Sequence, residues 1–203
     1  MATGPAHRIR AGLVWAVVAL VTVAPLLAAA ASPLLEWREP VYVVAGFAGI
    51  VAMALLLVQP LLAAGALPGL AGRRGLRSHR YAGAAALVVV LVHVAGLWMT
   101  SPPDVIDALT FTAPTAFSAW GVIAMWALVI AALLAAFHRR TRLWHLAHRM
   151  LALVIAIASA AHALLIEGTM EPVSKVAACA VMVVATVAVV ARVRIRAAGG
   201  MSR

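Results

Sequence analysis

Six long apolar segments dominate the 203-residue sequence. Each can cross the hydrocarbon core of a bilayer as an α-helix, which takes about 20 residues. The chain is 66% hydrophobic and 11% charged, whereas soluble domains are about 45–50% apolar and about 25% charged. The sequence therefore predicts an all-α integral membrane protein, one domain over residues 1–203 folded as a six-helix bundle. The predicted helices are residues 11–31, 41–64, 81–99, 115–137, 148–166 and 173–193.

The charged residues fall on two sides of such a bundle. With six crossings, 14 of the 16 basic residues share one side, and all six acidic residues lie on the other with Arg38 and Lys175. Basic loops stay in the cytoplasm, so we expect a cell membrane protein with both termini cytoplasmic. The net charge of +10 is then a topology signal, and no nucleic-acid partner is expected. The 14 residues are Arg8, Arg10, Arg73, Arg74, Arg77, Arg80, Arg139, Arg140, Arg142, Arg149, Arg192, Arg194, Arg196 and Arg203.

Three other stretches bear on this topology. The first apolar run ends in AAAASP, like a secretory signal, but it is longer than the usual apolar part of about 7–15 residues. We favour a retained helix, with cleavage as the alternative. Residues 63–80 are expected to form an inner loop or a short surface helix, and residues 101–115 the longest outer linker. There is no P-loop and no strand-linked glycine fingerprint for a nucleotide.

A histidine pattern occurs twice in the sequence. His-Arg, twelve mostly apolar residues and a second His run from His79 to His93 and again from His148 to His162. Fourteen residues turn a helix by about 1400°, about 40° short of four turns, so both histidines of a pair share one face about 21 Å apart along the axis. If two such helices face each other, an imidazole of one helix therefore lies opposite an imidazole of the other at each of two depths.

This donor set indicates haem rather than another metal centre. Zinc and non-haem iron sites need three or four protein ligands at one level, whereas each level here offers two imidazoles. A porphyrin supplies four nitrogens, and two histidines fill the axial positions. We expect two haem b groups between the third and fifth helices, the inner iron bound by His79 and His148 and the outer by His93 and His162. No CxxCH is present for covalent attachment.

Several alternatives remain for these residues. His145 is the rival of His148, but it lies about 100° off the face of His162. A single haem is possible, since His79 and His148 lie near the membrane boundary. A buried histidine is a functional hypothesis by default, but it also serves simply to bond neighbouring helices. Arg80 and Arg149 are candidates for holding haem propionates, or mark only the basic side.

The sequence resembles the ferric reductase-like transmembrane domain family, which includes ferric reductases, NADPH oxidases and the membrane haem subunit of the bacterial periplasmic methionine sulfoxide reductase system. The resemblance rests on His79-Arg80 with His93, and on Trp144-His145-Leu146-Ala147-His148-Arg149 with His162. It implies two stacked b-type haems that carry electrons from the cytoplasmic to the outer side. Large members continue into a flavin and NADPH module, and this sequence ends about ten residues after its sixth predicted helix.

The expected function is therefore that of a transmembrane oxidoreductase or its electron-transfer subunit. The donor is expected to be quinol or a separate flavoprotein with FAD or FMN and NAD(P)H, which the arginine-rich inner loops would dock. The outer acceptor is ferric iron, oxygen or a periplasmic reductase. Two alternatives stay open: a haem subunit that works only in a periplasmic reductase complex, and a haem-free transporter or structural membrane protein.

Overall fold

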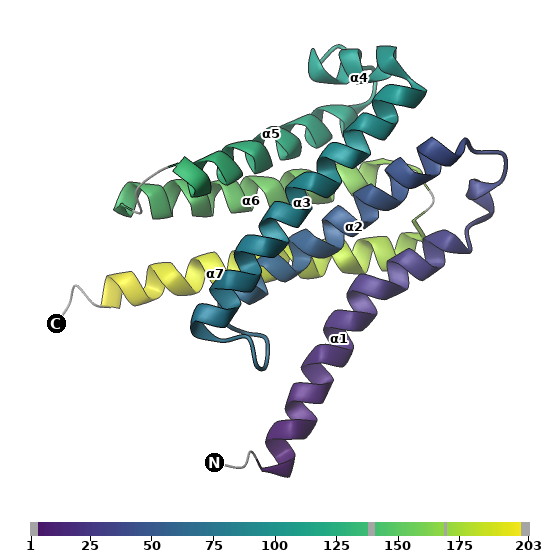
Figure 1. Ribbon diagram of the computed structural model, residues 1–203. Coiled ribbons are helices and arrows are strands. Elements are labelled where there is room, and N and C mark those ends of the chain that lie inside the picture. The colour runs from purple at the N-terminus through teal and green to yellow at the C-terminus, as the bar shows by residue number, and fades with distance from the viewer. Residues whose placement is uncertain (1–3, 138–140, 169, 200–203) are drawn as a thin grey trace.

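The computed structural model describes residues 4–137, 141–168 and 170–199, with seven α-helices and one 3-10 helix in those ranges (Figure 1). Six of the α-helices are long and apolar enough to cross a membrane. The chain is therefore a multi-pass membrane protein, and the six expected spans are confirmed. In chain order the elements are α1 (Pro5–Ala30), η1 (Pro33–Leu35), α2 (Pro40–Ala63), α3 (Gly72–Thr100), α4 (Pro102–Leu109), α5 (Ala116–Phe137), α6 (Arg142–Leu165) and α7 (Pro172–Gly199).

The helices at the basic end start earlier than the apolar runs suggest. Most of the stretch expected to be an inner loop or surface helix is the beginning of α3, which is continuous from Gly72 to Thr100. Likewise α6 starts at Arg142, where the Oγ1 of Thr141 accepts the backbone N–H of Trp144 at 3.1 Å. An apolar run marks only the part of a helix inside the bilayer, so it misses charged first turns. His79 and His148 consequently lie within helices, not at their first residues.

The outer linker contains a helix that was not predicted. Residues 102–109 form α4, which begins with two prolines and has Asp104 in its first turn. Proline fits a first turn because its missing N–H has no intrahelical acceptor there. The Ser101 hydroxyl donates to Asp104 at 2.6 Å, and Val105 is buried. The eight residues of α4 are too few to cross a bilayer, so long apolar runs in the sequence do not reveal it.

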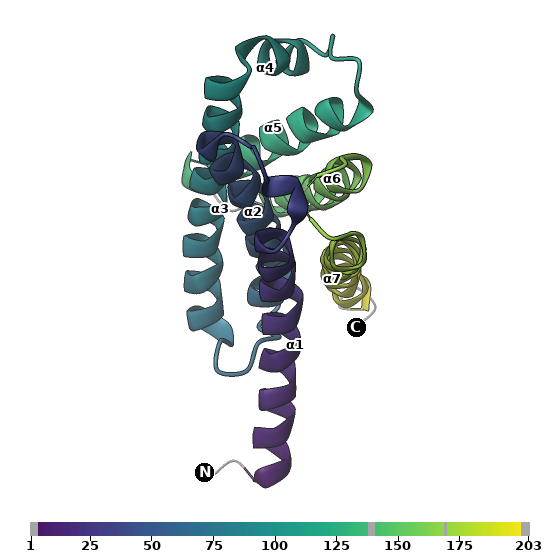
Figure 2. The ribbon, with the colours of Figure 1, turned by 90° about the vertical axis from the view of Figure 1, so that its right-hand side faces the viewer.

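The helices pack as two hairpins with α1 and α7 beside them. α2 packs along α3, α5 packs along α6, and α7 contacts both α2 and α6. Among the described helices, α3 and α6 are not packed closely backbone to backbone, and α2 and α5 lie beside them (Figures 1 and 2). Both α3 and α6 run in the same direction, away from the end where α1 begins and α7 ends. Because α3 and α6 are parallel, histidines with the same spacing on the two helices can lie at the same depths.

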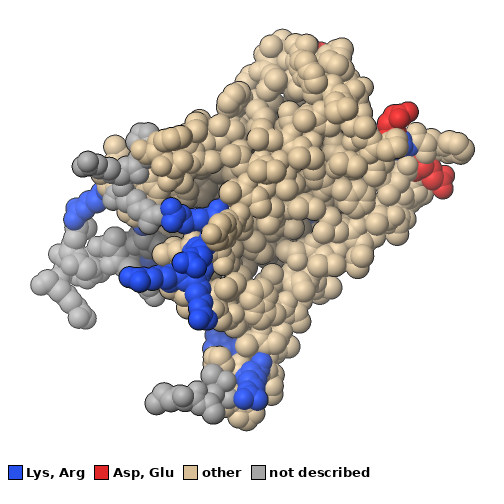
Figure 3. All heavy atoms as spheres, in the orientation of Figure 1, with Lys and Arg blue, Asp and Glu red and all other residues tan. Residues whose placement is uncertain are grey.

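The two ends of the bundle differ in charge. Figure 3 shows Lys and Arg gathered where α1 begins and α7 ends, and Asp and Glu toward the opposite end. The six acids lie in the α1–α2 connection, in α4 and in the α6–α7 connection. This is the separation expected from the sequence, while the assignment of the basic end to the cytoplasm stays a prediction. His138, Arg139, Arg140 and Arg203 lie outside the described residues, as do the side chains of Arg194 and Arg196.

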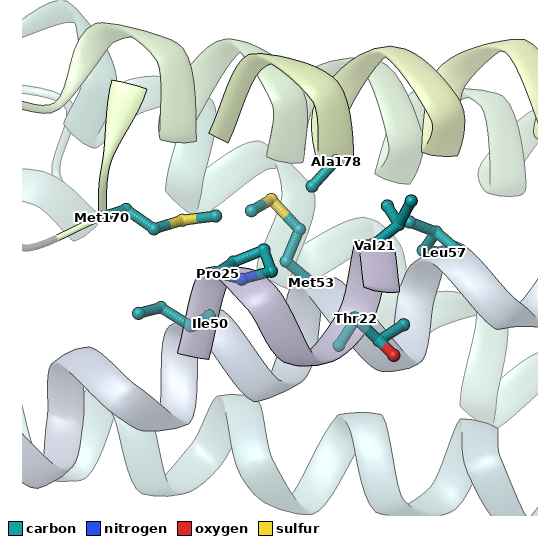
Figure 4. Close-up of a pocket in the computed structure, with 9 residues that line it drawn as sticks. Val21, Thr22, Pro25, Ile50, Met53, Leu57, Met170 and Ala178 are labelled. Carbon is teal, nitrogen blue, oxygen red and sulfur yellow. The ribbon is translucent and has the colours of Figure 1, made fainter. Parts of the chain in front are cut away.

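Small and sulfur-containing side chains fill the core between α2, α6 and α7. It contains Met53, Ala160, Cys179 and the fully buried Met182, with the Sγ of Cys179 3.8 Å from the Sδ of Met53. Small residues let membrane helices approach closely. A cavity of about 10 Å³ lies between α1 and this core (Figure 4), with room for about one water molecule. A cofactor the size of haem does not fit there.

The start of α7 depends on a charged cap outside the membrane. The Glu171 carboxylate accepts the backbone N–H groups of Ser174 at 2.7 Å and Val173 at 2.8 Å. These bonds, that of Ser174 first, lower the pKa of Glu171. The ionised form is therefore favoured by folding, and its stabilising effect is lost as the pH falls through the lowered pKa.

Replacing Glu171 by Gln is expected to lower the thermal midpoint of the detergent-solubilised protein at pH 7. The difference from the wild type should shrink as the pH falls below the usual carboxyl range, because the wild-type cap is then protonated too. Thermal unfolding followed by circular dichroism between pH 3 and pH 7 measures this. Glu167→Gln, an exposed acid in the same connection, is the control; an equal effect of both variants would contradict the cap.

Candidate functional site

The four histidines expected to share two levels form two pairs in the structure. The rings of His79 and His148 have centroids 6.2 Å apart, and those of His93 and His162 are 6.4 Å apart. The ring planes cross at 79° and 80°. We call His79 and His148 the inner pair, because they lie nearer the basic end, and His93 and His162 the outer pair. Equal spacing on two parallel helices thus produces two similar sites, one above the other.

Neighbouring helices hold three of these rings through their Nδ1 atoms. His93 Nδ1 lies 2.7 Å from the carbonyl oxygen of Ala45 on α2, and His162 Nδ1 lies 2.8 Å from that of Phe117 on α5. His79 Nδ1 lies 3.2 Å from the Gln59 carbonyl on α2. A carbonyl oxygen only accepts, so each Nδ1 carries the proton and donates. The lone pair of each neutral ring is therefore on Nε2, the atom left for a metal.

Two glycines make room for the outer pair. A Cβ on Gly49 would lie 3.1 Å from His93 Nδ1, and one on Gly121 would lie 2.8 Å from His162 Nδ1. Each glycine comes four residues after the residue whose carbonyl accepts the imidazole, Ala45 or Phe117. A helical side chain leans over the turn before it, so a larger residue at this position would cover the carbonyl. Glycine lets the ring reach it.

The inner pair is held differently. Gln59 bonds His79 twice, since its side-chain Nε2 also donates to the His79 carbonyl at 3.3 Å. The ring of His148 stacks on that of Trp144, with centroids 5.1 Å apart and planes 6° apart. The indole N–H of Trp144 donates to the Leu134 carbonyl on α5 at 2.8 Å. The ring of His79 is thus held by Gln59, and the ring of His148 lies against Trp144.

His148, and not His145, faces His79. His145 is exposed, and its Nδ1 donates to the Thr141 carbonyl at 2.7 Å. Sequence spacing favoured His148 with His145 as its rival, and the structure brings His148 to the inner pair. Arg80 is exposed and Arg149 is half-buried, each one residue after a histidine of the inner pair. Their role toward propionates stays a prediction.

Sequence reasoning missed the residues that orient the histidines. Gln59, Gly49 and Gly121 lie on α2 and α5, which carry no histidine at either level. A polar residue and lone glycines inside apolar runs were the available signals. Trp126 is 51% exposed on α5. It therefore faces outward from the helix bundle.

The histidine pairs fit haem ligation. Metal–imidazole bonds of about 2.0–2.1 Å, with each ring centroid about 1.1 Å beyond its nitrogen, place two opposed centroids about 6.3 Å apart. The two observed separations, 6.2 and 6.4 Å, agree with this value. In the described part of the chain, no three His, Cys, Asp or Glu residues group closely enough to hold a metal ion. Two imidazoles per level are the number of ligands that a haem iron needs in addition to the four nitrogens of its porphyrin.

Comparisons with known proteins give one match. The family model described as "Ferric reductase like transmembrane component" matches residues 46–159, more than half of the chain. The matched range begins in α2 and ends in α6, and it includes most of both hairpins and three of the four paired histidines. Searches of curated proteins and of solved structures found no match.

Adding a methyl group at Gly121 is expected to displace the His162 ring. Gly121→Ala places a Cβ within van der Waals overlap of Nδ1, and such overpacking costs about 1–3 kcal/mol. If the outer pair holds a haem, its loss should lower the haem content per chain, and Gly49→Ala should have the same but milder effect. Haem per chain is measured by the pyridine haemochrome assay.

Gly46→Ala on α2 is the matched control, because a Cβ there meets nothing within 4 Å. It adds the same methyl group to α2, the helix that carries Gly49, and should keep the wild-type haem content. Equal haem in the Gly121 and Gly46 variants would show that the glycine at 121 is not needed for the histidine to reach its place.

Proposed function

Since the chain belongs to the ferric reductase-like transmembrane family, we propose that it is a dihaem b-type cytochrome that carries electrons across the membrane. The family match supports membrane electron transfer in general. The finer proposal rests on one observation, the two histidine pairs on α3 and α6 with nearly equal ring separations. We further propose that residues 1–203 act as a single such domain.

In this function the protein would hold the two haems and insulate them from water. His79 and His148 would bind one haem iron, and His93 and His162 the other, through Nε2. The carbonyls of Gln59, Ala45 and Phe117 fix the tautomer and the orientation of three of these ligands, and such bonds also raise ligand basicity. When bound, haem would supply one-electron redox chemistry, and two histidines at each iron would favour electron transfer over binding of oxygen to the iron. Apolar side chains between the levels, among them Leu128 and Ile155, exclude water.

Electrons would enter at the basic end and leave at the acidic end. Exposed arginines at the start of α3 and α6, including Arg73, Arg77 and Arg142, suit an acidic flavoprotein donor, with membrane quinol as the alternative donor. At the other end the acceptor would be ferric iron, oxygen or a periplasmic reductase. Co-purification of a soluble redox protein, with activity that requires it, would mark the chain as a subunit rather than a self-standing reductase.

Purified protein is expected to carry two haems per chain. A reduced-minus-oxidised spectrum should show a low-spin b-type cytochrome, and His93→Ala or His79→Ala should each remove one haem, because each removes an axial ligand at one level. The pyridine haemochrome assay counts them. Folded protein free of haem would overturn the proposal and leave the histidines as helix-bonding residues.

The crossing angles of the rings predict a spectroscopic signature. Nearly perpendicular imidazole planes at both levels would leave two d orbitals of a bound iron close in energy, because each ring would interact with a different one. Both oxidised haems should therefore give low-spin electron paramagnetic resonance (EPR) signals with an unusually large highest g-value. Rhombic signals typical of parallel imidazole planes would contradict the ring orientations described above.

A further inference from the structure

The helices next to α3 and α6 set the orientation of the histidines. α2 accepts a hydrogen bond from both histidines of α3, through the carbonyls of Gln59 and Ala45. α5 does the same for His162 through Phe117. Each bond fixes the ring plane, because rotating the ring would move Nδ1 away from its acceptor. The remaining histidine, His148, is in contact with a side chain of its own helix.

The contact between Trp144 and His148 is a parallel stack. Residues four apart lie on the same face of a helix, and here the two rings are 5.1 Å apart with planes only 6° apart. A flat indole against one face of an imidazole restricts the rotation of that ring. The plane of His148 is therefore coupled to the plane of Trp144.

Trp144 makes further contacts through its indole and its backbone. Its ring N–H donates to the Leu134 carbonyl near the end of α5 at 2.8 Å, and its backbone N–H donates to the Thr141 side chain. The ring of His145 lies edge-on against it, with centroids 4.8 Å apart. Trp144 is thus fixed both to its own helix and to α5, and it is half-buried.

We propose that Trp144 is a positioning residue for the inner pair, which transmits the position of α5 to the ring of His148 and so sets the crossing angle with His79. The inference rests on the proposed function, because it takes His148 as a haem ligand. Through Leu134 and the indole, α5 does for His148 what the Phe117 carbonyl does for His162. The 79° angle of the inner pair is then fixed by Gln59 on one side and Trp144 on the other.

The test compares two substitutions at this position in the purified full-length protein. Trp144→Leu removes both the stack and the bond to Leu134, whereas Trp144→Phe keeps an aromatic face and removes only the N–H donor. EPR spectra of the oxidised protein are recorded, and His79→Ala identifies the signal of the inner haem by its loss. Trp126→Leu is the matched control, since it removes an indole from the exposed side of α5.

The expected result is confined to one signal. In Trp144→Leu the highest g-value of the inner haem should shift and broaden, or that haem should be lost and the content fall from two to one per chain. The outer signal should stay unchanged. Trp144→Phe should give a smaller shift of the same signal, and Trp126→Leu none.

Three results would overturn the inference while leaving the proposed function intact. One is wild-type signals for both haems in Trp144→Leu. Another is an equal change of both haems in the two Trp144 variants, which would indicate a general role in folding. If Trp144→Leu does not accumulate, an unshifted inner signal in Trp144→Phe overturns it. A wild-type protein without haem would instead be a failure of the proposed function itself.

Discussion

The bonded imidazole N–H inside an apolar span is the constraint on which the rest of the bundle depends. An unsatisfied polar group in the membrane costs several kcal/mol, so each deep histidine needs an acceptor from another helix. A helical carbonyl already accepts one N–H, but it has a second lone pair. Ala45 and Phe117 use it for His93 and His162 at 2.7 and 2.8 Å. At the inner level the residue four after Gln59 is Ala63 instead of glycine, and the bond to His79 is longer, at 3.2 Å.

This requirement gives the bundle a repeated design. The hairpin of α2 and α3 and the hairpin of α5 and α6 each combine one helix that carries two of the four paired histidines with one that helps to orient them. The outer level repeats the same elements in both hairpins: a carbonyl, a glycine four residues later and an imidazole donor. The inner level differs between them, since Gln59 serves His79 whereas Trp144 lies against His148. The two levels have similar ring separations but different supports, which gives the protein separate means of adjusting each site.

Much of this architecture can be predicted without coordinates, and the failures have identifiable causes. Hydropathy finds the six spans because membrane helices must be long and apolar, yet it places the starts of α3 and α6 too late, where arginines occupy the first turns. It also overlooks α4, which is too short to span and is started by Pro102 and Asp104. Helical periodicity selects His148 over His145, as the structure does. Periodicity says nothing about Gln59, Gly49 or Gly121, because they act on histidines of a different helix.

The sequence by itself determined the number of spans, the division of charge between the two ends and the fourteen-residue spacing that puts two histidines on one face. These are local properties of helices and of their solvent, so they follow from composition and period. Only the tertiary structure decided that α3 and α6 bring those faces together at matched depths, and that backbone carbonyls of α2 and α5 take the imidazole protons. Every residue has such a carbonyl, and which one a histidine meets depends on how helices distant in sequence pack against each other.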